Sequence, residues 1–233
     1  MNLLVFSDIH GNSYALDALL QKMSSLKYDK IIFCGDIFGY YYNQKDVIQK
    51  LIGLENLIWL KGNHDEYFLN LYSNSNIKEP FIENYGHSYD NLNVNYDISD
   101  IDIISNLPSH YVLTDTDCKI GIFHGTPDTP LEGRLYPNTI IENPSVYQDY
   151  DIVILGHTHC RMARLEGSTL IVNPGSLGQP RDGNGYGYAM IDTTCKSVIF
   201  KNVYFDESPL YNQIDKYDTN LTKLKAVLER GTQ

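Results

Sequence analysis

The sequence lacks long apolar runs, closely spaced cysteines and a surplus of basic residues. No apolar run approaches the roughly 18 residues of a membrane span. The short apolar start after Met1 has no basic lead of the kind that signal peptides carry. The four cysteines are widely scattered and include no CxxC pair, which favours reduced thiols. These absences together predict a cytoplasmic protein.

Basic residues are few, since 18 Lys and Arg stand against 29 Asp and Glu, for a net charge of −11. They are also spread thinly, so we expect neither an extended contact with nucleic acid nor a contact with membranes. A small anionic substrate is still compatible with this charge, because bound divalent metals can reverse its local sign. With 42% hydrophobic residues, the 233-residue chain suits one large globular domain.

The first part of the chain alternates apolar runs with amphipathic stretches. Residues 1–66 read as strand, helix, strand, helix, strand, with the strands at 3–6, 31–34 and 57–60. Such alternation predicts a parallel sheet with right-handed crossovers. From residue 111 the pattern predicts strands at 111–114, 119–123, 152–155, 169–173, 187–192 and 197–204. A terminal amphipathic helix is expected between Ile214 and Leu228.

Residues from about 67 to 110 interrupt this alternation. They contain one clear helix signal, from Ser99 to Leu107, with a serine at its start and Pro108 as its stop. We interpret the stretch as an insertion near the functional site, within a single domain that spans residues 1–233.

Polar side chains gather at the ends of the expected strands. Asp8 and His10 follow the first strand and point to the same side of an extended chain, as do His157 and His159 after a later one. In open α/β sheets, ligands bind at the carboxyl ends of the strands. Nitrogen and oxygen donors of this kind suit a pair of borderline transition metals. The candidate metal ligands are Asp8, His10, Asp36, Asn63, His124, His157 and His159.

These stretches carry a resemblance to a known family. Asp8-x-His10, Gly35-Asp36, Gly62-Asn63-His64-Asp65, His124-Gly125 and Gly156-His157-Thr158-His159 resemble the five blocks of the calcineurin-like metallophosphoesterase superfamily, in the family's order. The stretch from Asn173 to Arg181 is similar to the closing block of its small bacterial phosphodiesterase-like branch. Two departures are visible: Tyr41-Tyr42 stands where that branch often has Gly-Pro, and residues 67–110 match no pattern of the branch.

The resemblance implies an α+β or α/β fold built as a four-layer αββα sandwich. It implies one metal held by Asp8, His10, Asp36 and His159, and a second held by Asp36, Asn63, His124 and His157, so that Asp36 bridges. The expected ions are two divalent transition metals, Mn²⁺ first, with Fe, Ni²⁺ or Zn²⁺ as alternatives. A hydroxide bridging them would attack phosphorus. His64 would be the catalytic residue that stabilises the oxygen charge or protonates the leaving oxygen.

The leading hypothesis is thus a metal-dependent phosphoesterase that hydrolyses a small phosphodiester or phosphomonoester. Alternatives are asymmetric hydrolysis of dinucleoside polyphosphates, a protein phosphatase, and a non-catalytic scaffold like the retromer subunit that resembles these enzymes. The presence of His64, which that subunit lacks, argues against a scaffold. Asp65 is expected to interact with the dipole of the helix that it opens.

Substrate selection would come from surfaces over the metals. Asn12, Tyr41 and Arg181 are candidate substrate contacts, although Asn12 could equally cap the first helix. The tyrosines Tyr40, Tyr41, Tyr42 and Tyr67 could stack on a base or sugar, or could serve packing alone.

Overall fold

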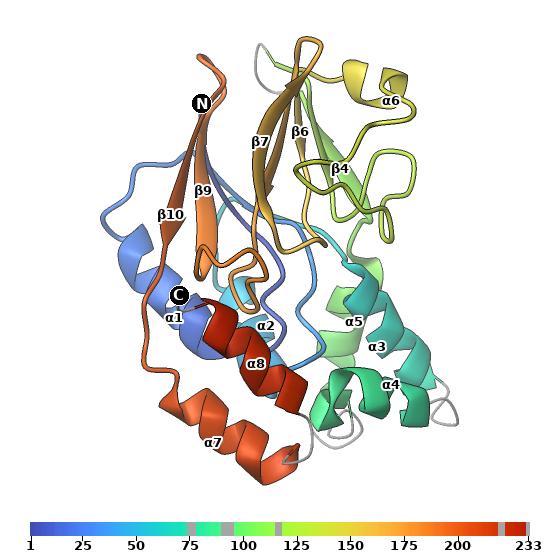
Figure 1. Ribbon diagram of the computed structural model, residues 1–233, viewed down its shortest axis with the longest axis vertical. Helices are drawn as coiled ribbons and strands as arrows, with labels where there is room; N and C mark the ends of the chain where they lie inside the picture. The colour runs from blue at the N-terminus through green and yellow to red at the C-terminus, as the bar shows by residue number, and fades with distance from the viewer. Residues whose placement is uncertain (74–77, 90–95, 115–117, 219–221, 232–233) are drawn as a thin grey trace.

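Two five-stranded sheets form the centre of the computed structural model, which describes residues 1–73, 78–89, 96–114, 118–218 and 222–231 (Figure 1). The first sheet has the strand order β10-β9-β1-β2-β3. Its parallel half consists of β1 (Asn2–Phe6), β2 (Lys30–Phe33) and β3 (Leu57–Trp59). β9 (Gly187–Asp192) pairs antiparallel with β1, and β10 (Ser197–Asn202) antiparallel with β9.

The second sheet has the order β4-β5-β6-β8-β7. Its three central strands, β5 (Ile120–Phe123), β6 (Ile152–Ile154) and β8 (Thr169–Pro174), are parallel. β4 (His110–Leu113) and β7 (Arg161–Glu166) close its edges in antiparallel pairing. Both sheets are therefore mixed: the parallel strands are central in the second sheet, whereas in the first they extend to its edge at β3.

The alternation of side chains along β1 explains how the layers pack. Leu3 and Val5 lie in the apolar cluster between the two sheets, whereas Leu4 and Phe6 face the cluster beneath α1 (Ser13–Met23) and α2 (Gln44–Ile52). Because this strand is buried on both faces, its apolar run is continuous rather than alternating. The sheets thus lie between outer layers, as the sequence predicts.

The outer layer on the second sheet is thin. Val153 and Ile171 face it and pack with Leu135 and Tyr147. The segment that supplies these partners contains one short helix, α6 (Ser145–Gln148), within a mostly irregular stretch. This layer is the least helical part of the αββα arrangement.

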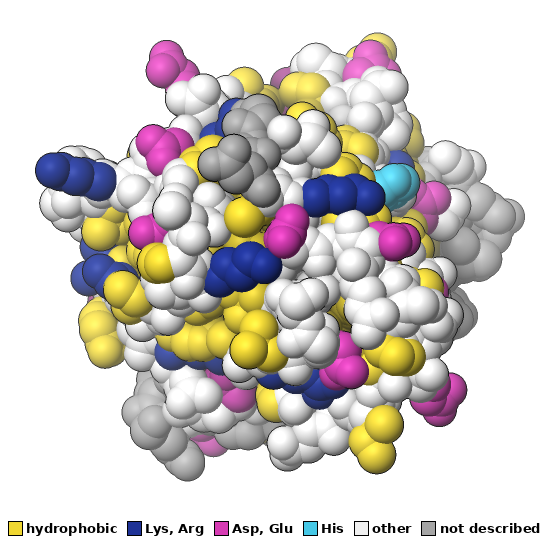
Figure 2. Space-filling model, turned by 90° about the horizontal axis from the view of Figure 1, so that it is seen from above, with side chains coloured by type: hydrophobic (Ala, Val, Ile, Leu, Met, Phe, Trp, Pro, Cys, Tyr) yellow, Lys and Arg dark blue, Asp and Glu magenta, His cyan; other side chains and the backbone are white. Residues whose placement is uncertain are grey.

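The helices α4 (Lys78–Tyr85) and α5 (Ile98–Asn106) lie within the expected insertion. They lie together with α3 (Asn63–Ser73), which begins before the insertion, beyond one end of the sheets (Figure 1). The helix expected from Ser99 to Leu107 is confirmed as α5 within one residue at each end. The opposite end of the molecule shows basic and acidic side chains interspersed rather than gathered by sign (Figure 2).

Two expectations about elements need correction. β7 was not among the expected strands, and the single terminal helix is two helices, α7 (Ser208–Tyr217) and α8 (Thr222–Gly231). Residues 219–221, including Leu221, lie outside the described residues. α7 ends where the buried Asp218 turns inward and accepts hydrogen bonds from Tyr42 Oη and from the backbone N–H of His87.

Candidate metal centre

The backbone at the carboxyl ends of the strands is strained where the expected ligands lie. Asp8 (φ 55°), His10 (49°), Asp36 (69°), His157 (65°) and His159 (58°) all take left-handed conformations. Residues other than glycine rarely adopt this region, and such strain concentrates at functional sites. Five of the seven expected ligands are therefore held in a conformation that the surrounding structure has to enforce.

Gly62 allows the strand ends to approach one another. A Cβ atom at this position would lie 2.0 Å from Oδ1 of Asp36 and 2.5 Å from its backbone nitrogen. Any side chain would thus displace Asp36, which explains the glycine before Asn63.

The expected ligands come together in two groups that share Asp36. Ligand atoms of Asp8, His10, Asp36 and His159 lie within 4.8 Å of one another, as do those of Asp36, His124 and His157. Nε2 of His159 is 3.2 Å from Oδ1 of Asp8, and Nε2 of His124 is 3.3 Å from Oδ2 of Asp36.

Asn63 belongs to the second group by position. Its Oδ1 lies 3.0 Å from Nε2 of His124. Both groups are buried beneath the surface.

Backbone carbonyls fix the tautomers of three histidines. Nδ1 of His10 lies 2.6 Å from the carbonyl oxygen of Phe38, that of His124 2.8 Å from Cys34, and that of His159 2.6 Å from Gln179. A carbonyl can only accept, so each Nδ1 carries a proton, and in a neutral ring Nε2 then presents a lone pair to the cluster. Nε2 of His10 and Nε2 of His159 are 3.0 Å apart, which leaves two lone pairs facing each other.

The carboxylates of Asp8 and Asp36 also indicate a site for a cation. Oδ1 of Asp8 and Oδ2 of Asp36 are buried and have no hydrogen-bond partner within the described part of the chain. Buried polar atoms without partners are costly and rare. Divalent ions would satisfy both oxygens and the converging nitrogens, so this set of donors fits divalent transition metals.

Burial and the charges of Asp8 and Asp36 shift the pKa values of histidines in the cluster. Burial lowers the pKa of His10 well below its ordinary value and that of His157 to about 3. Burial also acts to lower the pKa of His124, but Asp36 and then Asp8 raise it to about 9. Without an ion, a proton on His124 would offset the charge of Asp36. An ion would replace this proton, so metal binding is coupled to proton release.

Asp65 has a different role from the one expected. Its side chain is fully buried and accepts hydrogen bonds from the backbone N–H groups of Asp36, Ile37, Phe38 and Gly62. It therefore joins the loop after β2 to the start of α3, instead of serving chiefly the helix dipole. Burial, followed by the charge of Asp36, raises the pKa of Asp65 to about 7, while the backbone N–H donors act to lower it.

His64 lies beside the cluster at the start of α3. Its backbone N–H donates to Oδ1 of Asp36 (2.9 Å), and its ring centroid lies 4.9 Å from that of His10. Nδ1 lies 2.7 Å from the hydroxyl oxygen of Tyr89. Burial lowers the pKa of His64 to about 4.

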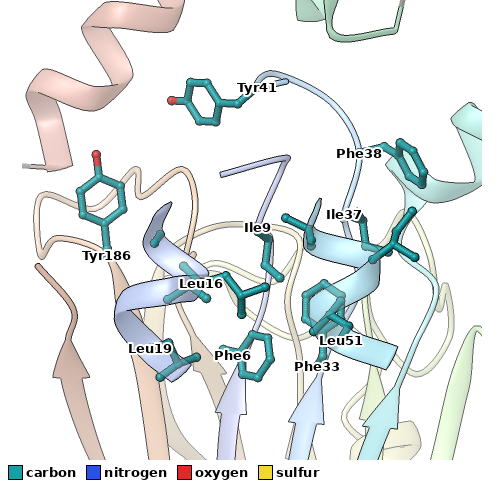
Figure 3. Close-up of a cluster of buried hydrophobic side chains, with 14 of the residues drawn as sticks. Phe6, Ile9, Leu16, Leu19, Phe33, Ile37, Phe38, Tyr41, Leu51 and Tyr186 are labelled. Atoms are coloured by element: carbon teal, nitrogen blue, oxygen red, sulfur yellow. The ribbon is translucent and has the colours of Figure 1, made fainter. Parts of the chain in front are cut away.

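Two of the expected substrate contacts are wrong. Asn12 is fully buried, with Oδ1 accepting from the backbone N–H of Ala15 (3.1 Å) and Nδ2 donating to the carbonyl of Gly178 (3.0 Å). It is a helix cap, the alternative left open above. Tyr41 is fully buried in the apolar cluster under α1 and α2 (Figure 3). The left-handed conformation of Tyr40 (φ 64°) accompanies this inward turn.

Tyr40 lies at the site, and so does Arg181, the third expected substrate contact. The Tyr40 ring centroid is 4.7 Å from that of His10 and 5.2 Å from that of His64. Arg181 is exposed, and its Nη2 donates to the Tyr40 hydroxyl (2.9 Å) and to Oε1 of Gln179 (2.8 Å). The placement of Arg181 is compatible with a substrate contact, which stays a prediction.

Three residues near the cluster were missed by the sequence analysis. Arg134 is exposed, and its Nε donates to Nε2 of His157 (2.9 Å). Tyr85 lies edge-on to His64 with ring centroids 4.6 Å apart, and Tyr89 holds Nδ1 of that ring. None of the three stands next to a recognisable block, so their spacing alone carried no signal. The tight turn in which Gly133 donates to the carbonyl of Thr129 brings Arg134 back to the site.

Two facing mixed sheets with a buried His/Asp cluster at their strand ends fit a metallophosphoesterase. The chain belongs to the calcineurin-like phosphoesterase superfamily, since the model of that superfamily's domain matches residues 1–196. This finding confirms the resemblance and the fold predicted from the sequence. No helix in the described ranges has the length and apolarity needed to cross a membrane.

Individual relatives agree with this assignment. An uncharacterized protein of Methanocaldococcus jannaschii is 26% identical over 234 residues, covering 91% of each chain. Phosphodiesterase YfcE of Escherichia coli K12 is 38% identical over 61 residues, which is 26% of this chain and 33% of that protein. The crystal structure of a metallophosphoesterase from Sphaerobacter thermophilus superposes with a TM-score of 0.80 at 25% identity, over the full length of both chains.

Proposed function

We propose that the protein hydrolyses a small phosphodiester or phosphomonoester with two divalent ions that share Asp36. The observation that carries this proposal is the pair of unpartnered carboxylate oxygens, on Asp8 and Asp36, among imidazoles whose lone pairs face them. Two bound ions would lower the pKa of a water molecule and offset the charge of the phosphate. Mn²⁺ is the first ion to test, and a cytoplasmic location is part of the same proposal.

Three of the chain's own groups could then act on the phosphate. His64 borders the cluster and can contact a phosphate oxygen, which makes it the catalytic residue of the proposal. Arg134 lies at the side of His157, and Arg181 at the side of Tyr40. Both guanidinium groups are exposed and can offer donors to phosphate oxygens.

Dinucleoside polyphosphate hydrolysis is a second candidate, favoured by the aromatic side chains near His64. Tyr40, Tyr67 and Tyr85 are partly exposed, and their ring centroids lie 5.2, 5.4 and 4.6 Å from that of His64. Such rings can stack on a nucleobase. Two arginines beside one cluster also suit a substrate with several phosphates.

The experiment is a screen of the Mn²⁺-loaded protein against chromogenic phosphodiesters and phosphomonoesters and against dinucleoside polyphosphates. His64→Ala is the matched variant, and we expect it to lose about 10²–10⁴-fold in kcat while its metal content stays near that of the wild type. Absence of hydrolysis with every ester, in protein shown by elemental analysis to hold two ions, would overturn the proposal. Hydrolysis that persists in His64→Ala would remove only the role of His64.

A further inference from the structure

Tyr89 connects the stretch expected as an insertion, residues 67–110, to the site. It follows α4, in the part of the chain that matches no block of the phosphodiesterase-like branch, and its side chain is fully buried. Its hydroxyl oxygen lies 2.7 Å from Nδ1 of His64. The insertion thus reaches the one imidazole at the site that is not among the expected metal ligands.

The direction of this hydrogen bond follows from the available partners. A buried hydroxyl proton needs an acceptor, and Nδ1 of His64 is the acceptor that Tyr89 reaches among the described residues. If the hydroxyl donates to Nδ1, a neutral imidazole must carry its proton on Nε2. Nε2 makes no hydrogen bond with the residues that the structure describes, so its proton is left for a substrate oxygen.

The surroundings of His64 hold the ring in this arrangement. Tyr40 and Tyr85 pack against it with ring centroids 5.2 and 4.6 Å away. On another side, a Cβ atom at Gly39 would lie 2.5 Å from Nδ1 and 3.1 Å from the Tyr89 hydroxyl. A larger residue at position 39 would therefore break the contact between the two side chains.

We infer that Tyr89 is a positioning residue, whose hydroxyl donates to Nδ1 of His64 and fixes the tautomer that presents Nε2–H to the phosphate. The inference rests on the role proposed above for His64. Of the two expected actions of this residue, stabilising oxygen charge and protonating the leaving oxygen, it selects the first. A neutral imidazole with its proton on Nε2 acts as a hydrogen-bond donor that stabilises charge on a phosphate oxygen. The insertion thereby contributes to the chemistry of the site as well as to its surface.

The first test reads the tautomer directly. In the full-length protein, ¹⁵N-labelled at histidine and loaded with diamagnetic Zn²⁺, the nitrogen shifts of His64 distinguish a protonated nitrogen from one with a lone pair. We expect the proton on Nε2 in the wild type and a mixture of tautomers in Tyr89→Phe. A proton on Nδ1 in the wild type would overturn the inference. Because this reading needs no substrate, it remains decisive even if the protein hydrolyses none of the esters.

The second test reads turnover. Tyr89→Phe should lower kcat about 3- to 10-fold, the effect of one neutral hydrogen bond, with KM and metal content unchanged. In a His64→Ala background the same substitution should have no further effect on kcat, because the hydroxyl acts through His64. An equal loss in both backgrounds would show that Tyr89 acts by another route.

Tyr96→Phe is the matched control. Tyr96 lies in the same insertion and packs against Phe38 and Phe68, with ring centroids 5.8 and 5.2 Å away. The control removes one hydroxyl that makes no contact with His64, and we expect it to change neither kcat nor the His64 shifts. A loss of kcat in Tyr96→Phe equal to that in Tyr89→Phe would mean that the insertion acts through its packing alone.

Discussion

Asp65→Asn tests how the metal-binding loop is held in place. Each carboxylate oxygen of Asp65 accepts two backbone hydrogen bonds: Oδ2 from Asp36 (3.0 Å) and Gly62 (2.8 Å), and Oδ1 from Ile37 (2.8 Å) and Phe38 (3.3 Å). Asparagine keeps the size of the side chain but replaces one oxygen with an NH₂ group. Whichever oxygen is replaced, two buried N–H groups lose their acceptor and face a donor.

The expected cost follows from this count. A buried donor left without a partner costs about 1–3 kcal/mol, so two of them cost about 2–6 kcal/mol of the free energy of unfolding. Such a loss is large beside the total stability of about 5–15 kcal/mol for an ordinary domain. Metal affinity should also fall, because either replacement removes hydrogen bonds that hold the backbone around Asp36, a ligand in a left-handed conformation.

The measurement is urea unfolding in EDTA, so that bound ions contribute nothing to the difference. Asp46→Asn is the control: Asp46 is half exposed and pairs with Lys50 within α2, and a surface pair of this kind is worth less than about 1 kcal/mol. If the free energy of unfolding of Asp65→Asn lies within about 1 kcal/mol of the wild-type value, the change is no larger than that of the control. The carboxylate then does not organise the loop, and the reasoning fails.

Three further outcomes are expected. Asp36→Ala should bind neither ion by elemental analysis, whereas His157→Ala should keep the ion of the group that includes Asp8 and His159; a full complement in Asp36→Ala would rule out sharing. Tyr40→Ala should raise KM for the best ester while the stability stays near that of the wild type. Tyr41→Ala should instead lower the free energy of unfolding by about 3–5 kcal/mol, as for other buried aromatic residues. The reverse pattern would contradict the placement of the two rings. Gly39→Ala should lower kcat without loss of metal, because its φ of 87° and the 2.5 Å approach to Nδ1 leave no room for Cβ; wild-type kcat would mean that His64 tolerates displacement.

Much of the site could be predicted because its ligands follow buried strands directly. Continuous apolar runs identified β1, β2 and β3, and the polar residues after them could only lie at the carboxyl edge of the sheet. The grouping of Asp8, His10, Asp36 and His159 in space agrees with the set implied by family resemblance.

Other features depend on contacts that spacing along the chain does not encode. β7 alternates partly buried and exposed side chains on an edge strand, so it has no apolar run to reveal it. Tyr41 looks like its neighbour Tyr40 in sequence, yet the left-handed turn at Tyr40 sends the two rings to opposite environments. Tyr89 meets His64 across 25 positions, from a stretch in which the sequence alone showed no recognisable pattern.

The positions of the strained ligands explain how the fold supports their left-handed conformations. The strained ligands follow strands that are buried on both faces, so the sheets determine where each chain segment emerges. Asp65 and the histidine-bound carbonyls then fix the direction of the loops with hydrogen bonds that need no ion. The unpartnered oxygens of Asp8 and Asp36 are the part that this framework leaves unsatisfied. A divalent ion held between these oxygens and the converging imidazoles would offset this buried charge, so its binding would also stabilise the folded chain.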